Sequence, residues 1–211
     1  MHAIICFGDS ITFGEGDVAN RGWCGRLQNA YEYDDYRFVY NLGICGDTTN
    51  DLLERLEGEL RARARTKYED DRSCILIAIG TNDARLNGST PETLIGTFTQ
   101  NMNAILTIAK RYGTVGVIGL TPVDESLSLD YEGTSFTNER QRTYHEALKD
   151  AARTHDVPFL DMFAAFLNEA YHEMLDDGLH PNAHGYAWMY EQISRFLVEN
   201  GLIESDELRA S

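Results

Sequence analysis

Ser10 directly follows the first apolar run of the chain, a position that makes it a candidate nucleophile. Residues 3–7 are mostly apolar and end at Gly8, which is typical of a short buried strand. A serine just beyond the carboxyl end of a strand lies where open α/β sheets form binding crevices. The backbone N–H groups of the following turn can then face an anion or a developing oxyanion. The alternative is that Asp9 or Ser10 merely caps a short helix.

Asp177 and His180 form a second candidate pair near the other end of the chain. Their separation by three residues lets a tight turn join the carboxylate to one imidazole nitrogen. Such a hydrogen bond fixes the tautomer and leaves the other nitrogen as a general base. Pro181 disfavours helical geometry at His180, so we expect His180 to precede the last helix and to face the crevice.

Gly43 and Asn82 follow two further strand candidates. Gly43 leaves the run 37–42, where a glycine allows close backbone approach and can free an N–H group, and Asn82 leaves the run 74–79. Each segment also has a purely structural interpretation, as a turn with an N-cap or as an Asx turn. Those interpretations do not explain why serine, glycine and asparagine recur at successive strand ends.

Short apolar runs alternate with helical patterns along the chain, which is typical of repeated βα units around a parallel sheet. We expect a three-layer α/β/α sandwich with a five-stranded parallel sheet in a single domain, residues 1–211, in which residues 204–211 form a frayed tail. The one long irregular connection is expected at 121–136, and loops of that length are often functional. The predicted strands are residues 3–7, 37–42, 74–79, 115–120 and 157–160, and the predicted helices are residues 22–32, 48–63, 91–111, 137–155 and 184–199.

Composition excludes several classes of function. The 211 residues carry a formal net charge of −16, which repels nucleic acid and anionic membrane surfaces. No segment approaches the roughly 20 apolar residues of a membrane helix, and the first apolar run lacks the basic flank of a secretory signal. The 4 cysteines show no metal-ligand spacing, and Cys45 is expected to be a buried, inert thiol. These features favour a cytoplasmic location with reduced thiols.

The four segments together resemble a known family, the SGNH hydrolases, also called GDSL-type esterases and lipases. The family is named for four residue types in separate blocks, and this sequence supplies them in order as Ser10, Gly43, Asn82 and His180. The likeness extends from Gly8 to His180 and into the last predicted helix. It implies the flavodoxin-like fold of that family and the activity of a carboxylic ester hydrolase.

The resemblance implies a role for each residue of the site. Ser10 attacks an ester carbonyl, His180 takes its proton and returns it to the leaving alcohol, and Asp177 orients His180. The oxyanion of the tetrahedral intermediate receives N–H groups from Ser10 and Gly43 and from the amide of Asn82, and one such donor is typically worth about 3 kcal/mol of barrier. The mechanism requires no metal and no cofactor.

Asp9 and Asp83 resemble supports that hold the loops of this family through hydrogen bonds. Two other functions stay open at this point. One is a metal-dependent phosphoesterase that uses Asp9, Asp83, Asp177 and His180. The other is a carbohydrate-binding protein on the same fold with no catalytic activity.

Charge near the 121–136 connection bears on the substrate. Residues 112–139 contain no lysine or arginine but five acidic residues: Asp124, Glu125, Asp130, Glu132 and Glu139. If this segment borders the site, polyanions such as coenzyme A thioesters are repelled, and neutral esters are favoured. The acyl group can then be an acetyl group on a sugar or a short fatty chain, and a lysophospholipid is also compatible with the family.

Overall fold

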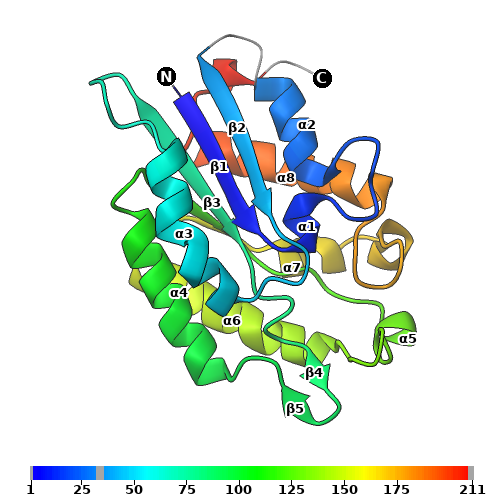
Figure 1. The fold of residues 1–211 in the computed structure, drawn as a ribbon. Helices are drawn as coiled ribbons and strands as arrows, with labels where there is room; N and C mark the ends of the chain where they lie inside the picture. Colours follow the sequence, from blue (N-terminus) through cyan, green and yellow to red (C-terminus); the bar gives the residue numbers. More distant parts are fainter. Residues whose placement is uncertain (1, 32–35, 209–211) are drawn as a thin grey trace.

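Five parallel strands form the central sheet of the computed structural model, which describes residues 2–31 and 36–208 (Figure 1). The strand order is β2-β1-β3-β6-β7, so that β1 lies between β2 and β3. A separate two-stranded hairpin, β4 and β5, follows β3. The strands are β1 (His2–Gly8), β2 (Arg37–Gly43), β3 (Arg72–Ala78), β4 (Leu86–Asn87), β5 (Thr90–Pro91), β6 (Thr114–Ile118) and β7 (Phe159–Leu160).

Helices cover both faces of the sheet. Helices α3, α4 and α6 pack on one face, and α2, α7 and α8 pack on the other (Figure 1). The three-layer α/β/α sandwich predicted from the sequence is therefore confirmed. The helices are α1 (Ser10–Phe13), α2 (Gly22–Tyr31), α3 (Thr49–Arg63), α4 (Ile95–Ala109), α5 (Glu125–Ser128), α6 (Asn138–Thr154), α7 (Met162–Leu167) and α8 (Ala183–Glu199), with 3-10 turns η1 (Tyr171–Met174) and η2 (Ser205–Glu207). None of them is both long and apolar enough to traverse a lipid bilayer, over the residues described.

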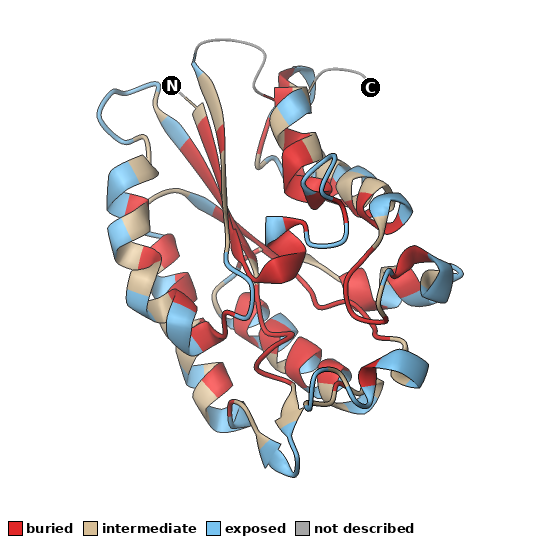
Figure 2. Ribbon diagram, turned by 45° about the vertical axis from the view of Figure 1, so that its right-hand side comes forward, coloured by how far each residue is buried: buried red, intermediate tan, exposed pale blue. Residues whose placement is uncertain are grey.

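Strand β1 shows how the sequence builds two cores. Successive side chains of a strand point to opposite faces, so Ile5 and Phe7 join the core under α3, α4 and α6. Ile4 and Cys6 join the core under α2, α7 and α8. All four are fully buried, and Figure 2 shows the strands enclosed between the helix layers. Because both faces of this strand are buried, its residues are apolar without interruption, which is the pattern seen in the sequence.

The carboxyl ends of β2, β1 and β3 are level with one another. Gly8, the last residue of β1, pairs with Gly43 of β2 on one side and with Ala78 of β3 on the other. The loops that leave these strands therefore start side by side. This register brings the segments that carry Ser10 and Asn82 to one edge of the sheet.

Most predicted boundaries differ from the structure by one or two residues, and two segments differ in kind. The helix expected from residue 91 begins at Ile95, because Thr90 and Pro91 pair with β4 in the hairpin. The predicted frayed tail is partly packed: Glu207 is buried and its carboxylate lies 2.7 Å from Nδ1 of His2. Residues 209–211 of that tail lie outside the described residues.

The segment 121–136 is less irregular than expected. It contains α5, and its end is tied to the hairpin by two backbone hydrogen bonds between Leu86 and Ser135, each 2.9 Å long. A second long connection, residues 161–182, was not recognised from the sequence. It holds α7 and η1, and its last turn carries Asp177 and His180.

Candidate active site

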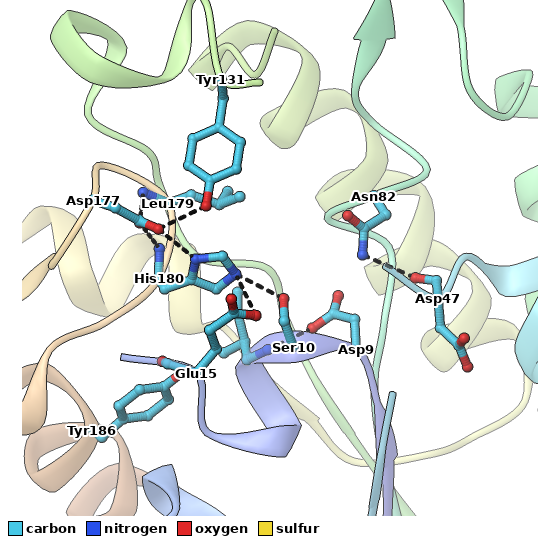
Figure 3. A network of polar contacts seen from close by, with 11 residues as sticks. Asp9, Ser10, Glu15, Asp47, Asn82, Tyr131, Asp177, Leu179, His180 and Tyr186 are labelled. Atoms are coloured by element: carbon cyan, nitrogen blue, oxygen red, sulfur yellow. Dashed lines mark hydrogen bonds and ion pairs between the residues drawn. The ribbon is translucent and has the colours of Figure 1, made fainter. Parts of the chain in front are cut away.

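Ser10, His180 and Asp177 form a continuous hydrogen-bonded chain (Figure 3). Oγ of Ser10 lies 2.8 Å from Nε2 of His180. Nδ1 of the same ring lies 2.8 Å from Oδ2 of Asp177. With the ring proton on Nδ1, the Ser10 hydroxyl donates to Nε2, which is the arrangement of a nucleophile and its general base.

A short turn holds Asp177 and His180 in this geometry. Oδ1 of Asp177 accepts the backbone N–H groups of Leu179 and His180, at 2.9 and 2.7 Å. The backbone of Gly178 between them has a φ of +89°, and a Cβ there would lie 2.6 Å from Leu127. A glycine is therefore required at this position. Helix α8 begins three residues after His180, at Ala183, as the position of the proline predicts.

The candidate nucleophile, Ser10, is positioned by a four-residue helix. Asp9 caps α1 by accepting the N–H of Ile11 at 3.0 Å, and Ser10 is the first residue of the helix. Burial raises the pKa of Asp9 to about 7, and the hydrogen bond from Ile11 opposes that shift. The capping interpretation is confirmed for Asp9, and it is compatible with Ser10 as a nucleophile, because Asp9 caps the helix while Ser10 faces His180.

The charges around His180 favour its protonated form. Burial by itself lowers the pKa of this imidazole, but the hydrogen bond and charge of Asp177, then the charges of Glu15 and Asp9, outweigh it and raise the pKa above its ordinary value. The pKa of Asp177 shifts in the opposite direction. Its desolvation would raise the pKa, but the hydrogen bonds from His180 and Leu179 hold it well below the usual range, so Asp177 is a carboxylate.

Asn82 faces the same space from the end of β3. Its Nδ2 donates to the backbone carbonyl of Asp47 at 3.0 Å, which leaves the second hydrogen of the amide for another acceptor. Arg55 fixes this region: its Nε lies 2.9 Å from the Asp47 carboxylate, and it also donates to the carbonyls of Gly8 and Leu42. One guanidinium therefore links the ends of β1 and β2 to the loop that follows β2.

The structure corrects the prediction for Gly43. Its N–H already donates to Oδ1 of Asn41 at 3.0 Å, so it is not free for an oxyanion. A Cβ at Gly43 would lie 2.2 Å from the backbone nitrogen of Phe13, so this glycine serves the close packing of α1 on β2. Gly46, three residues later, lines the cavity beside Ser10 instead, and its N–H has no acceptor among the described residues.

A cavity of about 440 Å³ opens in front of Ser10. Of the acidic residues predicted at the entrance, Glu132 lines it, and Glu15 contributes a second carboxylate. Arg85 also reaches the wall, but its Nε lies 3.0 Å from the carboxylate of Glu92. The lining residues are Ser10, Glu15, Cys45, Gly46, Asn82, Arg85, Asn87, Tyr131, Glu132, Thr134, Phe136, Leu179 and His180.

Comparison with known proteins identifies the family. The model of the GDSL-like lipase/acylhydrolase family matches residues 6–188, which include every residue of the site described above. The chain belongs to this family. As a GDSL-like acylhydrolase it is a carboxylic ester hydrolase, as the four sequence blocks imply.

Individual relatives of this GDSL-like acylhydrolase are distant but extend over nearly its whole length. It is 25% identical to an arylesterase of Vibrio mimicus, over 93% of this chain and 88% of that protein. It is 28% identical to an isoamyl acetate-hydrolyzing esterase of Saccharomyces cerevisiae, over 92% of this chain and 84% of that protein. The crystal structure of a lipase/acylhydrolase from Enterococcus faecalis has the same fold, with a TM-score of 0.74 and 24% identity over 100% of this chain and 99% of that one.

Sequence reasoning missed two further residues of the acylhydrolase site. Tyr131 donates its hydroxyl to Oδ2 of Asp177 at 2.8 Å, and its ring meets that of His180 edge to face at 6.2 Å. Glu15 places a carboxylate oxygen 3.6 Å from Nε2 of His180. Tyr131 could not be assigned a place from the sequence, because the segment 121–136 shows neither a helical nor a strand pattern of apolar residues. Glu15 could have been found from the sequence, because it follows Ser10 by only five residues and so has to lie near it.

Asp9 and Asp83 lie in separate hydrogen-bond systems. Asp83 accepts both the N–H and the hydroxyl of Thr49, at 2.9 and 2.6 Å, and so joins the end of β3 to the start of α3. Within residues 2–31 and 36–208, no group of three or more His, Cys, Asp and Glu side chains is arranged to hold a metal ion. The four residues of the phosphoesterase alternative are therefore not a ligand set.

Cys45 is exposed, contrary to the prediction of a buried thiol. It lines the cavity and contacts Glu15. Partial burial, followed by the hydrogen bond and charge of Glu15, raises the pKa of Cys45 to about 11. The thiol is therefore expected to be protonated at neutral pH, because partial burial beside the carboxylate of Glu15, and not enclosure in a core, disfavours the thiolate.

Proposed function

We propose that this acylhydrolase cleaves carboxylic esters in two steps through an acyl-enzyme intermediate on Ser10. The observation that carries the proposal is the unbroken series of hydrogen bonds from Ser10 through His180 to Asp177, each 2.8 Å long. In the first step Nε2 of His180 takes the hydroxyl proton while Oγ of Ser10 bonds to the ester carbonyl carbon. The imidazolium then gives that proton to the oxygen of the leaving alcohol.

The second step mirrors the first with water as the nucleophile. His180 removes a proton from water, the hydroxide attacks the acyl carbon, and the proton returns to Oγ of Ser10 as the acid leaves. Asp177 holds the Nδ1 proton and stabilises the imidazolium in both steps. Its low pKa suits this task, because Asp177 stays ionised throughout.

Three donors are suited to the oxyanion formed in each step. They are the backbone N–H groups of Ser10 and Gly46 and the free amide hydrogen of Asn82. The first two have no acceptor among the described residues, and Asn82 is held by Asp47. Donors fixed before the reaction cost no reorganisation when charge develops, which is why this kind of stabilisation is large.

The preferred substrates in this proposal are short-chain or acetyl esters without negative charge. A cavity of about 440 Å³ holds a small ester but not a long acyl chain together with a bulky alcohol. Glu15 and Glu132 line the cavity, whereas the guanidinium of Arg85 is paired with Glu92. A net negative wall disfavours anionic esters such as coenzyme A thioesters.

A profile of acyl length tests this preference. We expect kcat/KM for 4-nitrophenyl esters to be highest for acetate to butyrate and to fall about tenfold or more by decanoate, because the longer chain cannot be buried in the cavity. An anionic ester, such as a hemisuccinate, is expected to react more slowly than the neutral butyrate. A maximum at long chains would refute the proposed substrate class while leaving the esterase chemistry intact.

A further inference from the structure

Glu15 lies beside the nitrogen that exchanges the proton in the proposed reaction. Its Oε2 is 3.6 Å from Nε2 of His180, the same nitrogen that lies 2.8 Å from Oγ of Ser10 (Figure 3). The carboxylate of Asp177 holds the opposite side of the ring. The imidazole is thus flanked by two carboxylates, and the mechanism above uses only one of them.

The backbone of Glu15 is fixed while its side chain reaches into open space. Its N–H donates to the carbonyl of Ser10 at 3.1 Å, and its carbonyl accepts the hydroxyl of Tyr186 at 2.7 Å. The side chain is 48% exposed and lines the cavity. Among the residues that the structure describes, no lysine or arginine lies within 4.0 Å of its carboxylate. The side chain contacts Nε2 of His180 and the thiol of Cys45, and a carboxylate has further lone pairs, so Glu15 can also accept a hydrogen bond from a bound substrate.

The orientation that the ester needs for the reaction places its alcohol part, and not its acyl part, next to Glu15. The oxyanion must lie toward Asn82, and the leaving oxygen must lie toward His180, which protonates it. Figure 3 shows Asn82 on one side of Ser10, with His180 and Glu15 on the other. A group attached near the leaving oxygen therefore comes close to Glu15, whereas the acyl group does not.

We propose that Glu15 determines specificity by accepting a hydrogen bond from a hydroxyl on the carbon adjacent to the ester-bearing carbon. The preferred alcohols are accordingly vicinal diols, a class that includes polyols and sugars. Two gauche oxygens on adjacent carbons lie about one hydrogen-bond length apart. With the leaving oxygen at Nε2 of His180, the neighbouring hydroxyl thus reaches the carboxylate of Glu15. This inference rests on the proposed roles of Ser10 and His180.

A carboxylate discriminates between closely related alcohols because it can only accept hydrogen bonds. A hydroxyl donor forms a charge-assisted hydrogen bond with Glu15. An ether oxygen at the same place has no hydrogen to give and displaces water from the carboxylate without replacing its bond. Methylation of that one hydroxyl is therefore the sharpest change that the substrate allows.

A matched pair of acetates tests the inference. We expect kcat/KM for 2-hydroxyethyl acetate to exceed that for 2-methoxyethyl acetate by about tenfold in the wild-type enzyme, as one charge-assisted hydrogen bond predicts. Glu15→Ala should bring the ratio close to 1, and Glu15→Gln, which keeps a neutral acceptor, should give an intermediate ratio. Both variants should still hydrolyse 4-nitrophenyl acetate, whose leaving group has no such hydroxyl.

Two charge-matched variants separate the contact from a general effect of charge. Glu132→Gln removes a carboxylate from the same cavity, and Glu191→Gln removes one from the exposed face of α8. Neither should change the ratio of the two acetates. A wild-type ratio near 1, a ratio that survives Glu15→Ala, or an equal loss in Glu132→Gln would overturn the role of Glu15. Absence of aryl ester hydrolysis in the wild-type enzyme would instead refute the proposed function itself.

Discussion

The two ends of the sheet each carry a cavity with a buried serine, and the two cavities have similar volumes. The cavity at the carboxyl ends of the strands measures about 440 Å³ and contains Ser10. The one at the amino ends measures about 510 Å³ and contains Ser73. Ser73 Oγ accepts the N–H of Arg65 at 2.7 Å, and its nearest hydrogen-bond partners are backbone groups. Ser10 faces an imidazole.

Neither the volume of a cavity nor the presence of a serine is therefore enough to mark the candidate active site. The partners define it, and these partners arise from the geometry of parallel strands. At the carboxyl edge, each strand feeds a turn and the start of a helix, where N–H groups are unpaired and available. At the amino edge, the hydroxyl of Ser73 forms its hydrogen bonds with the backbone of Arg65, in the loop that leads into β3, and no side chain that the structure describes beside it acts as a base. The cavity at the amino end has a balanced charge, because three cations line it together with three carboxylates, whereas two carboxylates and one arginine line the cavity beside Ser10.

The largest effect is expected from exchanging each serine for alanine. Ser10→Ala should lower kcat for an aryl acetate by about 10⁴-fold or more, because no nucleophile is left. Ser73→Ala should leave kcat within about twofold and lower the free energy of unfolding by about 1 kcal/mol, through loss of its hydrogen bonds to Arg65. Steady-state kinetics and urea denaturation measure the two effects. Comparable losses of activity in both variants would abolish the contrast between the two ends.

An intermediate effect is expected at the proposed oxyanion site. Asn82→Ala should lower kcat by about 10²–10³-fold with little change in KM, since its amide acts on charge that develops only in the transition state. Asn103→Ala is the matched control on α4, where the amide donates to the carbonyl of Thr99 and touches no site residue. If Asn82→Ala raised KM and spared kcat, Asn82 would be a ground-state contact only.

The smallest effect is expected from Tyr131→Phe. The Tyr131 hydroxyl donates a hydrogen bond to Asp177 and so partly neutralises its negative charge. Without that hydroxyl, Asp177 stabilises the protonated imidazole more strongly, and the pKa of His180 rises further. Catalysis needs neutral His180, so kcat/KM rises with pH through this pKa, and the acid limb should move to higher pH with a fall of about threefold to tenfold at neutral pH.

Tyr144→Phe is the control for Tyr131→Phe. It removes a buried phenol hydroxyl that donates to the carbonyl of Thr93, outside the site. This variant should lose stability but keep the acid limb of the wild-type enzyme. An unchanged pH profile in Tyr131→Phe would show that its hydroxyl does not act on His180.

Much of this arrangement could be predicted from the sequence because it is encoded locally. The buried strands appear as apolar runs, and the glycine at the end of β1 marks the turn that carries Ser10. Asp177 and His180 lie in the same turn, so the spacing of three residues is enough to predict their hydrogen bond. The fold and this core of the candidate site therefore follow from short segments.

Other features depend on contacts between distant segments, and these could not be read from the sequence. Gly43 and Gly46 both fit a strand-end turn, and their roles differ because Gly43 packs against Phe13 and donates its N–H to Asn41, whereas Gly46 lines the cavity. Tyr131 meets Asp177 across 46 positions of the chain. Pro91 resembles a first-turn helix residue, but pairing with Leu86 places it in a strand. In each case a tertiary contact overrides or supplements the local pattern.

Covalent labelling with a fluorophosphonate, followed by peptide mass spectrometry, tests the central claim most directly. The reagent phosphonylates a serine only where a base activates it and donors stabilise the oxyanion. We predict one adduct per chain, located on Ser10, with complete loss of esterase activity at full labelling and no adduct in Ser10→Ala. An adduct on Ser73 or Cys45, or full activity in a chain labelled on Ser10, would contradict the account.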